Sequence, residues 1–323
     1  MKSTAGSGSA AAAREFLQRH GLAPHRERGQ NFLWDEQLAA KLVRLAGVRA
    51  EDAVLEVGTG LGILTRALAA QARRVATLEV DAGLVRALRA ESALPREVAL
   101  HHADALEQDL AGLAAALGPP VRVVANLPFS AAAPLLRVFL GMAPLLEGWG
   151  VTVQREMAAR IGAAPGERGY GSLAVLHAWL ARPGPRLDLH PRCFYPVPRV
   201  TSTFLTLTPR PPAPSAGHAE PHTRPPSATP RAGPPSTTPP ADPPSAAPSA
   251  GPPSAAELPR LEALLRAGFA HRRKTLANSL AHAAGLNPAE VRRRLAQHGL
   301  PPAARAQQLS PATWLSLART ILG

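Results

Sequence analysis

Apolar positions divide the chain into three parts. From residue 14 to residue 208, short β-branched or apolar runs alternate with helical patterns, whereas residues 257–323 show helical patterns throughout. The stretch between Pro209 and Pro253 contains no Ile, Leu, Val, Met, Phe, Trp or Tyr. Strands and helices alternating at this spacing are typical of a doubly wound, mainly parallel sheet. We therefore expect an α/β domain followed by a smaller all-helical C-terminal domain.

These periodicities predict seven strands and nine helices. The predicted strands are Ala53–Val57, Arg74–Val80, Val98–His102, Val121–Ala125, Val151–Gln154, Arg186–His190 and Thr201–Leu207. The last two flank a short Pro-rich loop, which indicates a hairpin-type end to a seven-stranded, Rossmann-like sheet. The predicted helices are Arg14–His20, Gly62–Ala70, Ala82–Ala90, Leu110–Leu117, Ala132–Leu140, Glu257–Ala270, Arg273–Ala284, Pro288–Gln297 and Pro311–Leu322.

Two segments are predicted to lie outside the folded domains of residues 14–208 and 257–323. Residues 1–13 have neither the apolar core of a signal peptide nor the arginines of a transit peptide, so we expect a disordered tail. Residues 209–256 hold 17 of the 35 prolines and nothing to bury, which predicts a disordered linker. A docking site for a proline-reading partner is the alternative for this linker.

The charge is strongly positive and unevenly distributed. The chain carries 36 Lys plus Arg and 23 Asp plus Glu, for a net charge of +13. Residues 254–323 alone hold ten basic and three acidic side chains, which is more than half of the surplus. A basic helical face of this kind favours a polyanionic partner such as RNA, the alternative being a solvated face with no partner.

The sequence gives no sign of a membrane span or of a metal centre. No run approaches 18 apolar residues without a charge, so we expect a cytoplasmic protein that does not contact a membrane. The single cysteine, Cys193, excludes an internal disulfide and a cysteine-based zinc or iron–sulfur site. We expect it to be a packed thiol.

A glycine-rich turn follows the first predicted strand of the sheet. Gly58-Thr59-Gly60-Leu61-Gly62 occupies the position where a ligand approaches the backbone closely. In a dinucleotide site the third glycine lies one position later, where this chain has Ile63. The turn is therefore wider at its end and less suited to a pyrophosphate.

Two acids occupy the ends of the next two predicted strands. Glu79 lies 21 residues after Gly58, where a carboxylate can accept hydrogen bonds from ribose hydroxyls, and Asp104 can accept from an adenine amine. Acids without basic residues favour a nucleoside that carries no phosphate, and S-adenosylmethionine is a cationic example. Taken singly, Glu79 can be a solvated strand end and Asp104 a helix cap.

The fourth predicted strand leads into Asn126-Leu127-Pro128-Phe129 at the same edge of the sheet. An adenine amine is a poor nucleophile because its lone pair is delocalised into the ring, so catalysis needs acceptors that hold its N–H bonds. Asn126 offers a side-chain carbonyl, Pro128 leaves the Leu127 carbonyl projecting from a fixed turn, and Phe129 offers a stacking face.

The chain resembles the ribosomal RNA adenine N6-dimethyltransferases from Gly29 to about Leu207 and from Glu257 to Leu280. The resemblance is carried by the glycine turn, by the Asn126–Phe129 motif and by four further segments. These are residues 29–35 (GQNFLWD), 154–156 (QRE), 165–171 (PGERGYG) and 194–202 (FYPVPRVTS). Residues 269–280 (FAHRRKTLANSL) are similar to the small-subunit ribosome-maturation branch, named for kasugamycin resistance on its loss.

The resemblance implies a set of ligand contacts. The residues implied to bind S-adenosylmethionine are Asn31, Leu33, Gly58, Gly60, Glu79, Asp104 and Asn126. Phe194 is implied to stack on the target base opposite Phe129, where the family usually has tyrosine. Asn126, Leu127, Pro128, Phe129 and Phe194 form the predicted catalytic set. We assign Arg155, Arg272, Arg273 and Lys274 to RNA, with the last three gripping phosphates at a helix start.

The resemblance also implies the reaction. We expect a monomeric methyltransferase that dimethylates two adjacent adenosines near the 3′ end of 16S ribosomal RNA, on an immature small subunit, during ribosome biogenesis. The alternatives are a macrolide-resistance type of 23S ribosomal RNA methyltransferase, a small-molecule methyltransferase, and an assembly factor that has lost catalysis.

Overall fold

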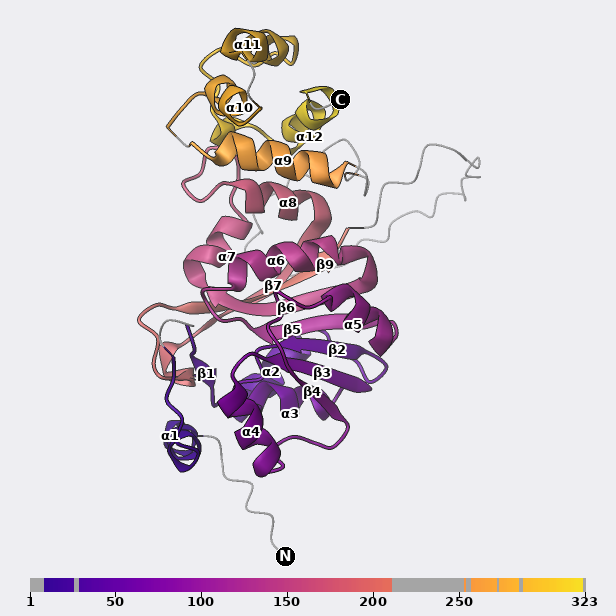
Figure 1. Cartoon of the computed structure of the whole chain (residues 1–323), viewed down its shortest axis with the longest axis vertical. Helices are drawn as coiled ribbons and strands as arrows, with labels where there is room; N and C mark the ends of the chain where they lie inside the picture. The colour runs from indigo at the N-terminus through magenta and orange to yellow at the C-terminus, as the bar shows by residue number, and fades with distance from the viewer. Residues whose placement is uncertain are drawn as a thin grey trace, which may run out of the picture.

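All seven predicted strands lie in one sheet. The computed structural model describes residues 9–25, 29–210, 253, 257–271, 273–284 and 287–321. The strands follow the order β4-β3-β2-β5-β6-β9-β7 across the sheet (Figure 1). Their bounds are β2 Ala53–Val57, β3 Arg74–Glu79, β4 Val98–His102, β5 Val121–Asn126, β6 Leu146–Gln154, β7 Ala181–Leu189 and β9 Ser202–Pro209.

The sheet is parallel from β4 to β6, and β9 enters antiparallel between β6 and β7. The predicted antiparallel pairing of the last two strands is therefore confirmed. The carboxyl ends of β2, β3, β4 and β5 meet at one edge, which is where a doubly wound sheet binds ligands.

Helices cover both faces of the sheet. Their bounds are α2 Glu36–Leu45, α3 Ile63–Ala69, α4 Ala82–Ala90, α5 Leu110–Leu117, α6 Ala132–Gly141, α7 Arg155–Ile161 and α8 Ser172–Leu180. Neighbouring strand residues point to opposite faces. Val54 and Val124 accordingly pack with α2 and α3, whereas Leu55 and Val123 pack with α5, α6 and α8.

The structure differs from the predicted elements at several places. Strand β7 begins at Ala181 and not at Arg186, and helices α2 and α7 were not predicted. Two further differences have physical causes. β6 begins at Leu146 and not at Val151, because Gly148 and Gly150 hide the strand signal. At Gly150 an ideal Cβ would lie 2.6 Å from Cζ of Phe204, so only glycine permits the close approach of β9. Helix α8 was not predicted, because it is apolar on nearly every side and so lacks a helical period.

The predicted tail of residues 1–13 was too long. Helix α1 spans Ala10–Arg19, and the Ser9 side chain caps it by accepting a hydrogen bond from Ala12 N at 3.1 Å. Ala13 and Leu17 bury their side chains against Phe32 and neighbouring residues. Residues 1–8 lie outside the described residues.

The predicted linker also began too early. Pro209 is the last residue of β9, and Arg210 donates from its backbone N to Leu180 O at 2.9 Å and from Nε to Ala181 O at 3.0 Å. The prediction of disorder for the remaining linker concerns residues that, apart from Pro253, lie outside the described part of the chain.

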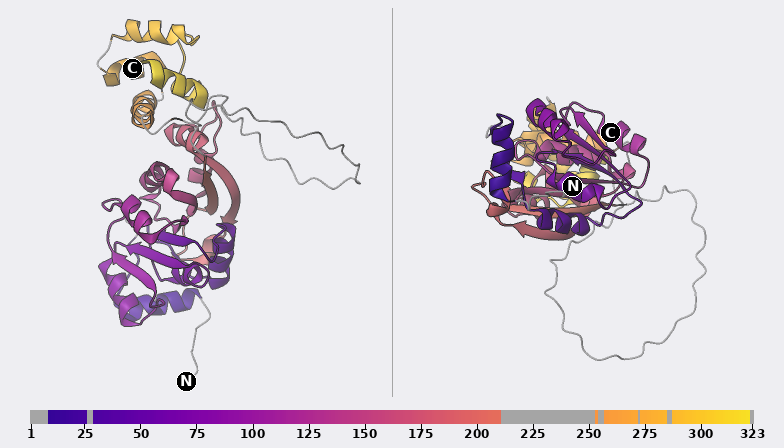
Figure 2. Two further views of the ribbon diagram at one scale, coloured as in Figure 1. Left: turned by 90° about the vertical axis from the view of Figure 1, so that its right-hand side faces the viewer. Right: turned by 90° about the horizontal axis from the view of Figure 1, so that it is seen from below.

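The C-terminal helices form a separate layer at one end of the molecule, beyond α8 (Figures 1 and 2). They are α9 Leu258–Phe269, α10 Leu276–Ala284, α11 Pro288–Gln297, the short 3-10 helix η3 Ala306–Gln308, and α12 Pro311–Ile321. The predicted start of α10 at Arg273 was three residues early, so Arg273 and Lys274 lie in the turn that precedes the helix. The predicted all-helical character of this region is confirmed within the described residues.

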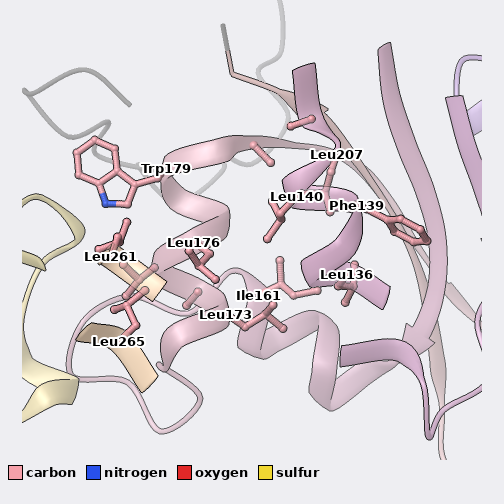
Figure 3. Packing of buried hydrophobic residues seen from close by; sticks show 14 of the residues in the cluster. Leu136, Phe139, Leu140, Ile161, Leu173, Leu176, Trp179, Leu207, Leu261 and Leu265 are labelled. Carbon is pink, nitrogen blue, oxygen red and sulfur yellow. The ribbon is translucent and has the colours of Figure 1, made fainter. Parts of the chain in front are cut away.

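A single apolar core joins the sheet to this helical layer. Leu173, Leu176 and Trp179 of α8 pack toward Leu261 and Leu265 of α9 (Figure 3). Since apolar burial is the main favourable term in folding, this contact fixes the helical layer on the α/β domain.

Hydrogen bonds from the α/β domain to the C-terminal backbone reinforce the contact. The Tyr170 hydroxyl donates to Leu309 O at 2.7 Å, and Trp179 Nε1 donates to Pro311 O at 3.0 Å. Burial raises the pKa of Tyr170, which keeps its hydroxyl a donor. Satisfied buried polar groups of this kind define one relative arrangement of the two parts.

Replacing Gly268 by alanine should loosen the helical layer. An ideal Cβ at Gly268 would lie 2.3 Å from Cη2 of Trp314, whose side chain is fully buried. Overpacking of this kind costs about 1–3 kcal/mol, so urea unfolding of Gly268→Ala should show a lower free energy of unfolding. Gly141→Ala is the matched control, because its Cβ meets nothing within 4 Å and alanine favours a helix. Equal stability of the two variants would contradict the close packing of Gly268 against Trp314.

Candidate active site

A cavity of about 420 Å³ lies at the carboxyl edge of the parallel strands. Its walls come from the glycine turn after β2, from the ends of β3, β4 and β5, and from the segment that precedes α2. It brings together every residue predicted to contact the cofactor or the base: Asn31, Leu33, Gly58, Gly60, Glu79, Asp104, Asn126, Leu127, Pro128, Phe129 and Phe194.

The glycine turn lies at the floor of the cavity in a conformation that favours glycine. The φ angles of Gly58, Gly60 and Gly62 are +85°, +55° and +73°. Gly58 N donates to Leu78 O at 2.8 Å, which ties the turn to the end of β3. An ideal Cβ at Gly60 would lie 3.1 Å from the ring of Phe32, so the turn is also closely covered by the N-terminal segment.

Glu79 is buried at the end of β3 and is bonded to the backbone around the turn. Its Oε2 accepts from Gly60 N at 2.9 Å and its Oε1 accepts from Asp81 N at 3.0 Å. Burial raises the pKa of Glu79, and these two N–H groups oppose the rise. The side chain is therefore not a solvated strand end, and the Gly60 bond holds it against the turn.

Asp104 lies at the end of β4, and it is exposed at the cavity wall. Its Oδ1 accepts from Leu106 N at 2.9 Å, so it stabilises the local turn as well as facing the cavity. Val80 and Leu106, next to the two acids, are among the most exposed large apolar side chains of the described residues. They give this end of the cavity apolar surface suited to a planar base.

The charge of the cavity wall selects among ligands. Among the described residues, those that line the cavity include Glu79 and Asp104 but no lysine, arginine or histidine. At these residues a phosphate would meet two acids and no cation, whereas a cationic nucleoside would be favoured. The lining therefore fits the positively charged sulfur and the ribose of S-adenosylmethionine better than it fits a dinucleotide.

Asn126 links the end of β5 to the N-terminal segment. Its Nδ2 donates to Asn31 O at 3.0 Å, which leaves Oδ1 of the same amide as the acceptor. Gly29, with φ of +66°, packs against the same motif, and an ideal Cβ there would lie 3.2 Å from Phe129 N. The N-terminal segment thus lies directly on the Asn126–Phe129 motif.

A two-stranded ribbon brings Phe194 into the wall. Strand β1 (Phe32–Leu33) pairs antiparallel with β8 (Phe194–Tyr195), and Leu33 faces Phe194 in the register. Phe194 is only 2% exposed, and it lines the cavity together with half-buried Phe129. Both residues therefore line the same cavity.

Glu56 is an important residue that the sequence analysis missed. It lies in the middle of β2, fully buried, and its Oε2 accepts from the Thr65 hydroxyl of α3 at 2.6 Å. Burial raises its pKa to about 8. Since Glu56 lies two residues before Gly58, its hydrogen bond with Thr65 ties α3 to the strand that leads into the glycine turn. The signal available in the sequence was an acid in the otherwise apolar strand AVLEV.

The residues assigned to RNA lie outside the cavity. Arg155 is exposed at the start of α7, and Arg273 and Lys274 are exposed in the turn before α10. None of these three forms an ion pair with a described residue. Arg272 lies outside the described residues.

Three further features concern the rest of the chain. The described residues contain no group of three or more His, Cys, Asp or Glu side chains arranged to hold a metal ion. Cys193 packs against the core beside Phe194, and burial raises the pKa of its thiol. No described helix is both long and apolar enough to cross a bilayer.

Comparison with known proteins identifies the family. The model of the family described as ribosomal RNA adenine dimethylase matches residues 22–222. The chain belongs to this family. It is 38% identical to ribosomal RNA small subunit methyltransferase A of Cereibacter sphaeroides strain ATCC 17025, over 96% of each chain. It is 35% identical to the protein of the same name from Rhodospirillum rubrum, over 95% of this chain and 91% of the relative.

Solved structures share the fold. The 23S rRNA methyltransferase ErmE aligns with a TM-score of 0.54 and 24% identity, covering 90% of this chain and 98% of ErmE. A dimethyladenosine transferase from Plasmodium falciparum aligns with a TM-score of 0.58 and 18% identity, covering 87% of this chain and 94% of that one. Family membership, predicted from the motifs, and the Rossmann-like sheet with its helical C-terminal region are thus confirmed.

Replacing Glu56 by glutamine should change how stability depends on pH. A carboxyl whose pKa rises from 4.5 in the unfolded chain to about 8 in the folded one binds an extra proton when folded between those values, so folding stability falls as pH rises. Glutamine removes this titration and keeps the shape. The free energy of unfolding of Glu56→Gln, measured relative to wild type in urea, should increase from pH 5 to pH 8. A pH-independent difference would contradict the buried, protonated state of Glu56.

Proposed function

We propose that this chain transfers methyl groups from S-adenosylmethionine to the N6 atoms of adenosines in small-subunit ribosomal RNA. The observation that carries the proposal is a single cavity. One end is lined by the acids Glu79 and Asp104, which suit a nucleoside, and the same cavity is lined by the Asn126–Phe129 motif. The family and the name shared by the full-length curated relatives support the same activity.

The residues of the cavity fit S-adenosylmethionine in polarity and in shape. When bound, this cofactor supplies a methyl group on a positively charged sulfur. Glu79 would accept hydrogen bonds from the ribose hydroxyls, and Asp104 would accept from the exocyclic amine of the cofactor base. Gly58 and Gly60 allow the backbone to approach closely because they carry no Cβ. Asn31 and Leu33 close the cavity from the N-terminal side.

The same residues that end β5 position the target adenine. Oδ1 of Asn126 and the carbonyl of Leu127 accept from the two N–H bonds of N6, which turns the nitrogen lone pair toward the methyl group. Phe129 and Phe194 hold the two faces of the ring. Alignment of this kind can supply up to about 7–11 kcal/mol of the acceleration.

After transfer, the alkylated nitrogen carries a positive charge and is acidic, so its proton leaves to water or to a nearby carbonyl. The polar oxygens of Asn126 and Leu127 stabilise the charge as it develops. Dimethylation requires the cavity to accept the monomethyl product. The small residues Ser130 and Ala131, which line the cavity after Phe129, leave room for it.

The finer substrate follows from the resemblance. We propose two adjacent adenosines near the 3′ end of 16S ribosomal RNA, in an unpaired loop where unstacking costs little, as the targets of four transfers. We propose that the protein acts as a monomer, in the cytoplasm, on immature small subunits. Labelled methyl transfer to undermethylated small subunits, compared with naked 23S RNA and followed by mapping of the modified base, tests the substrate against the macrolide-resistance alternative.

Asn126→Ala should abolish the chemical step without abolishing binding. Removing a polar group that stabilises developing charge costs about 10²–10³ in kcat. We expect single-turnover methyl transfer to fall by at least that range, while RNA affinity stays near the wild-type value. Asn278→Ala, at an exposed asparagine of α10, is the control. Normal turnover by Asn126→Ala would overturn the mechanism.

The assembly-factor alternative is tested by the same protein preparations. Equilibrium binding of S-adenosylmethionine with no transfer by the wild-type chain would favour a non-catalytic role.

Replacing Arg273 and Lys274 together by alanine should weaken RNA binding and reduce its salt dependence. Each cation that neutralises a phosphate contributes about 0.9 to the slope of log affinity against log salt, so the slope should fall by about 2. Arg293 and Arg294 provide the control, because both are paired with Glu290 at 2.8 and 3.0 Å. Their replacement by alanine should change the slope less. An unchanged slope in the first variant would indicate a solvated face.

A further inference from the structure

The connection from β8 to β9 is an exposed loop at the rim of the cavity. We call residues Pro196 to Thr201 the 196–201 loop. It leaves the cavity wall directly after Phe194 and Tyr195, and it ends where Arg155 N donates to Thr201 O at 2.9 Å. It lies beside β1 at one end of the sheet in Figure 1.

The far end of the loop also lies near the reaction centre. Ser202 pairs with Gln154 at the carboxyl end of β6, and Thr152 of β6 pairs with Asn126 of β5. The loop therefore runs from one wall of the base site to the strand next to Asn126. A substrate larger than one nucleoside would meet this loop as it leaves the cavity.

The loop exposes apolar side chains that the proposed chemistry does not use. Val197 is 59% exposed and Val200 is 43% exposed. Pro196 and Pro198 restrict the backbone around Val197, so this side chain is presented with little entropy left to lose on binding, and Val200 follows two residues after Pro198. Isolated exposed valines are ordinary, but two on a proline-braced loop beside an active site form a contact surface.

The charge around the two valines indicates the chemistry of the partner that would contact them. Arg155, Arg192 and Arg199 are exposed, and none forms an ion pair with a described residue. Arg14 of α1 adds a further cation, with Cζ 5.7 Å from the centre of the Tyr195 ring. Glu156 is the exposed acid next to Arg155, which leaves the surroundings of the loop net positive.

Apolar side chains among unpaired arginines match the chemistry of single-stranded RNA. Unstacked bases present apolar faces and sugars, and each nucleotide carries a phosphate that binds cations. We propose that the 196–201 loop docks the nucleotides that flank the target adenosine: Val197 and Val200 pack against unstacked bases, and Arg192 and Arg199 neutralise phosphates. This inference rests on the proposed function and adds an RNA contact at the 196–201 loop to the one assigned to Arg155 on the α/β domain.

The test compares Val197→Ser/Val200→Ser with Leu145→Ser. Leu145 is 43% exposed but precedes β6, at the opposite edge of the sheet. On undermethylated small subunits, the double variant should show a kcat/KM about tenfold lower, corresponding to about 1.4 kcal/mol, with wild-type affinity for S-adenosylmethionine. Leu145→Ser should match wild type.

A second readout reports the contact itself. The probe is an RNA hairpin that has two adjacent adenosines in its loop and 2-aminopurine next to them. The fluorescence of 2-aminopurine rises when this base is unstacked. Wild type and Leu145→Ser should raise the fluorescence, and the double variant should raise it less. Arg199→Gln should lower the salt slope of hairpin binding, whereas Arg96→Gln, at an exposed arginine on the opposite edge, should not.

The outcomes separate this inference from the proposed function. A wild-type chain that methylates no small subunits refutes both. Active wild type together with wild-type kinetics and fluorescence in the double variant overturns the loop contact alone. Slower transfer to subunits with an unchanged hairpin response also overturns it, because the loop would then contact a ribosomal protein.

Discussion

The hydrogen bond from Asn126 Nδ2 to Asn31 O is the interaction on which the rest of the site depends. It joins the end of β5 to a segment nearly a hundred residues earlier in the chain, and it sets the orientation of an amide that can otherwise point either way. Because the NH₂ group is engaged, the oxygen is the acceptor available to a substrate amine. This contact closes the cavity at the Asn126–Phe129 motif and sets which polar atom of Asn126 is available there.

The contact is held from both sides by backbone geometry. Gly29 permits the N-terminal segment to lie on Phe129, and the β1–β8 ribbon fixes the same segment to Phe194. Glu79 does the equivalent work at the other end by binding the backbone of Gly60. Pre-positioned groups of this kind need little rearrangement when charge develops, which is how an active site lowers a barrier without strong acids or bases.

The molecule separates opposite charges in space. Acids line the cavity, where a cationic donor is favoured, whereas unpaired arginines and a lysine lie on the surface, where phosphates are favoured. The continuous core through α8, with Tyr170 and Trp179 bonded to the C-terminal backbone, fixes the distance between these regions. In the proposed function, RNA held at the surface is therefore presented to the cavity in a restricted set of positions.

Local patterns were enough to predict the seven strands, a mainly parallel sheet, the glycine turn and the placement of Glu79, Asp104 and Asn126 at one edge of the sheet, because each of these signals spans only a few residues. They did not reveal β6 before Val151, whose glycines are required by Phe204 on a distant strand, nor α8, which is buried on nearly all sides and shows no period. Nor did they reveal Glu56, since the pKa of a carboxyl depends on burial by segments far away in sequence. The sequence by itself thus determines which residue types are present for the proposed chemistry. Their orientation, their protonation and the contact between the two folded parts depend on packing between distant segments, which only the tertiary structure decides.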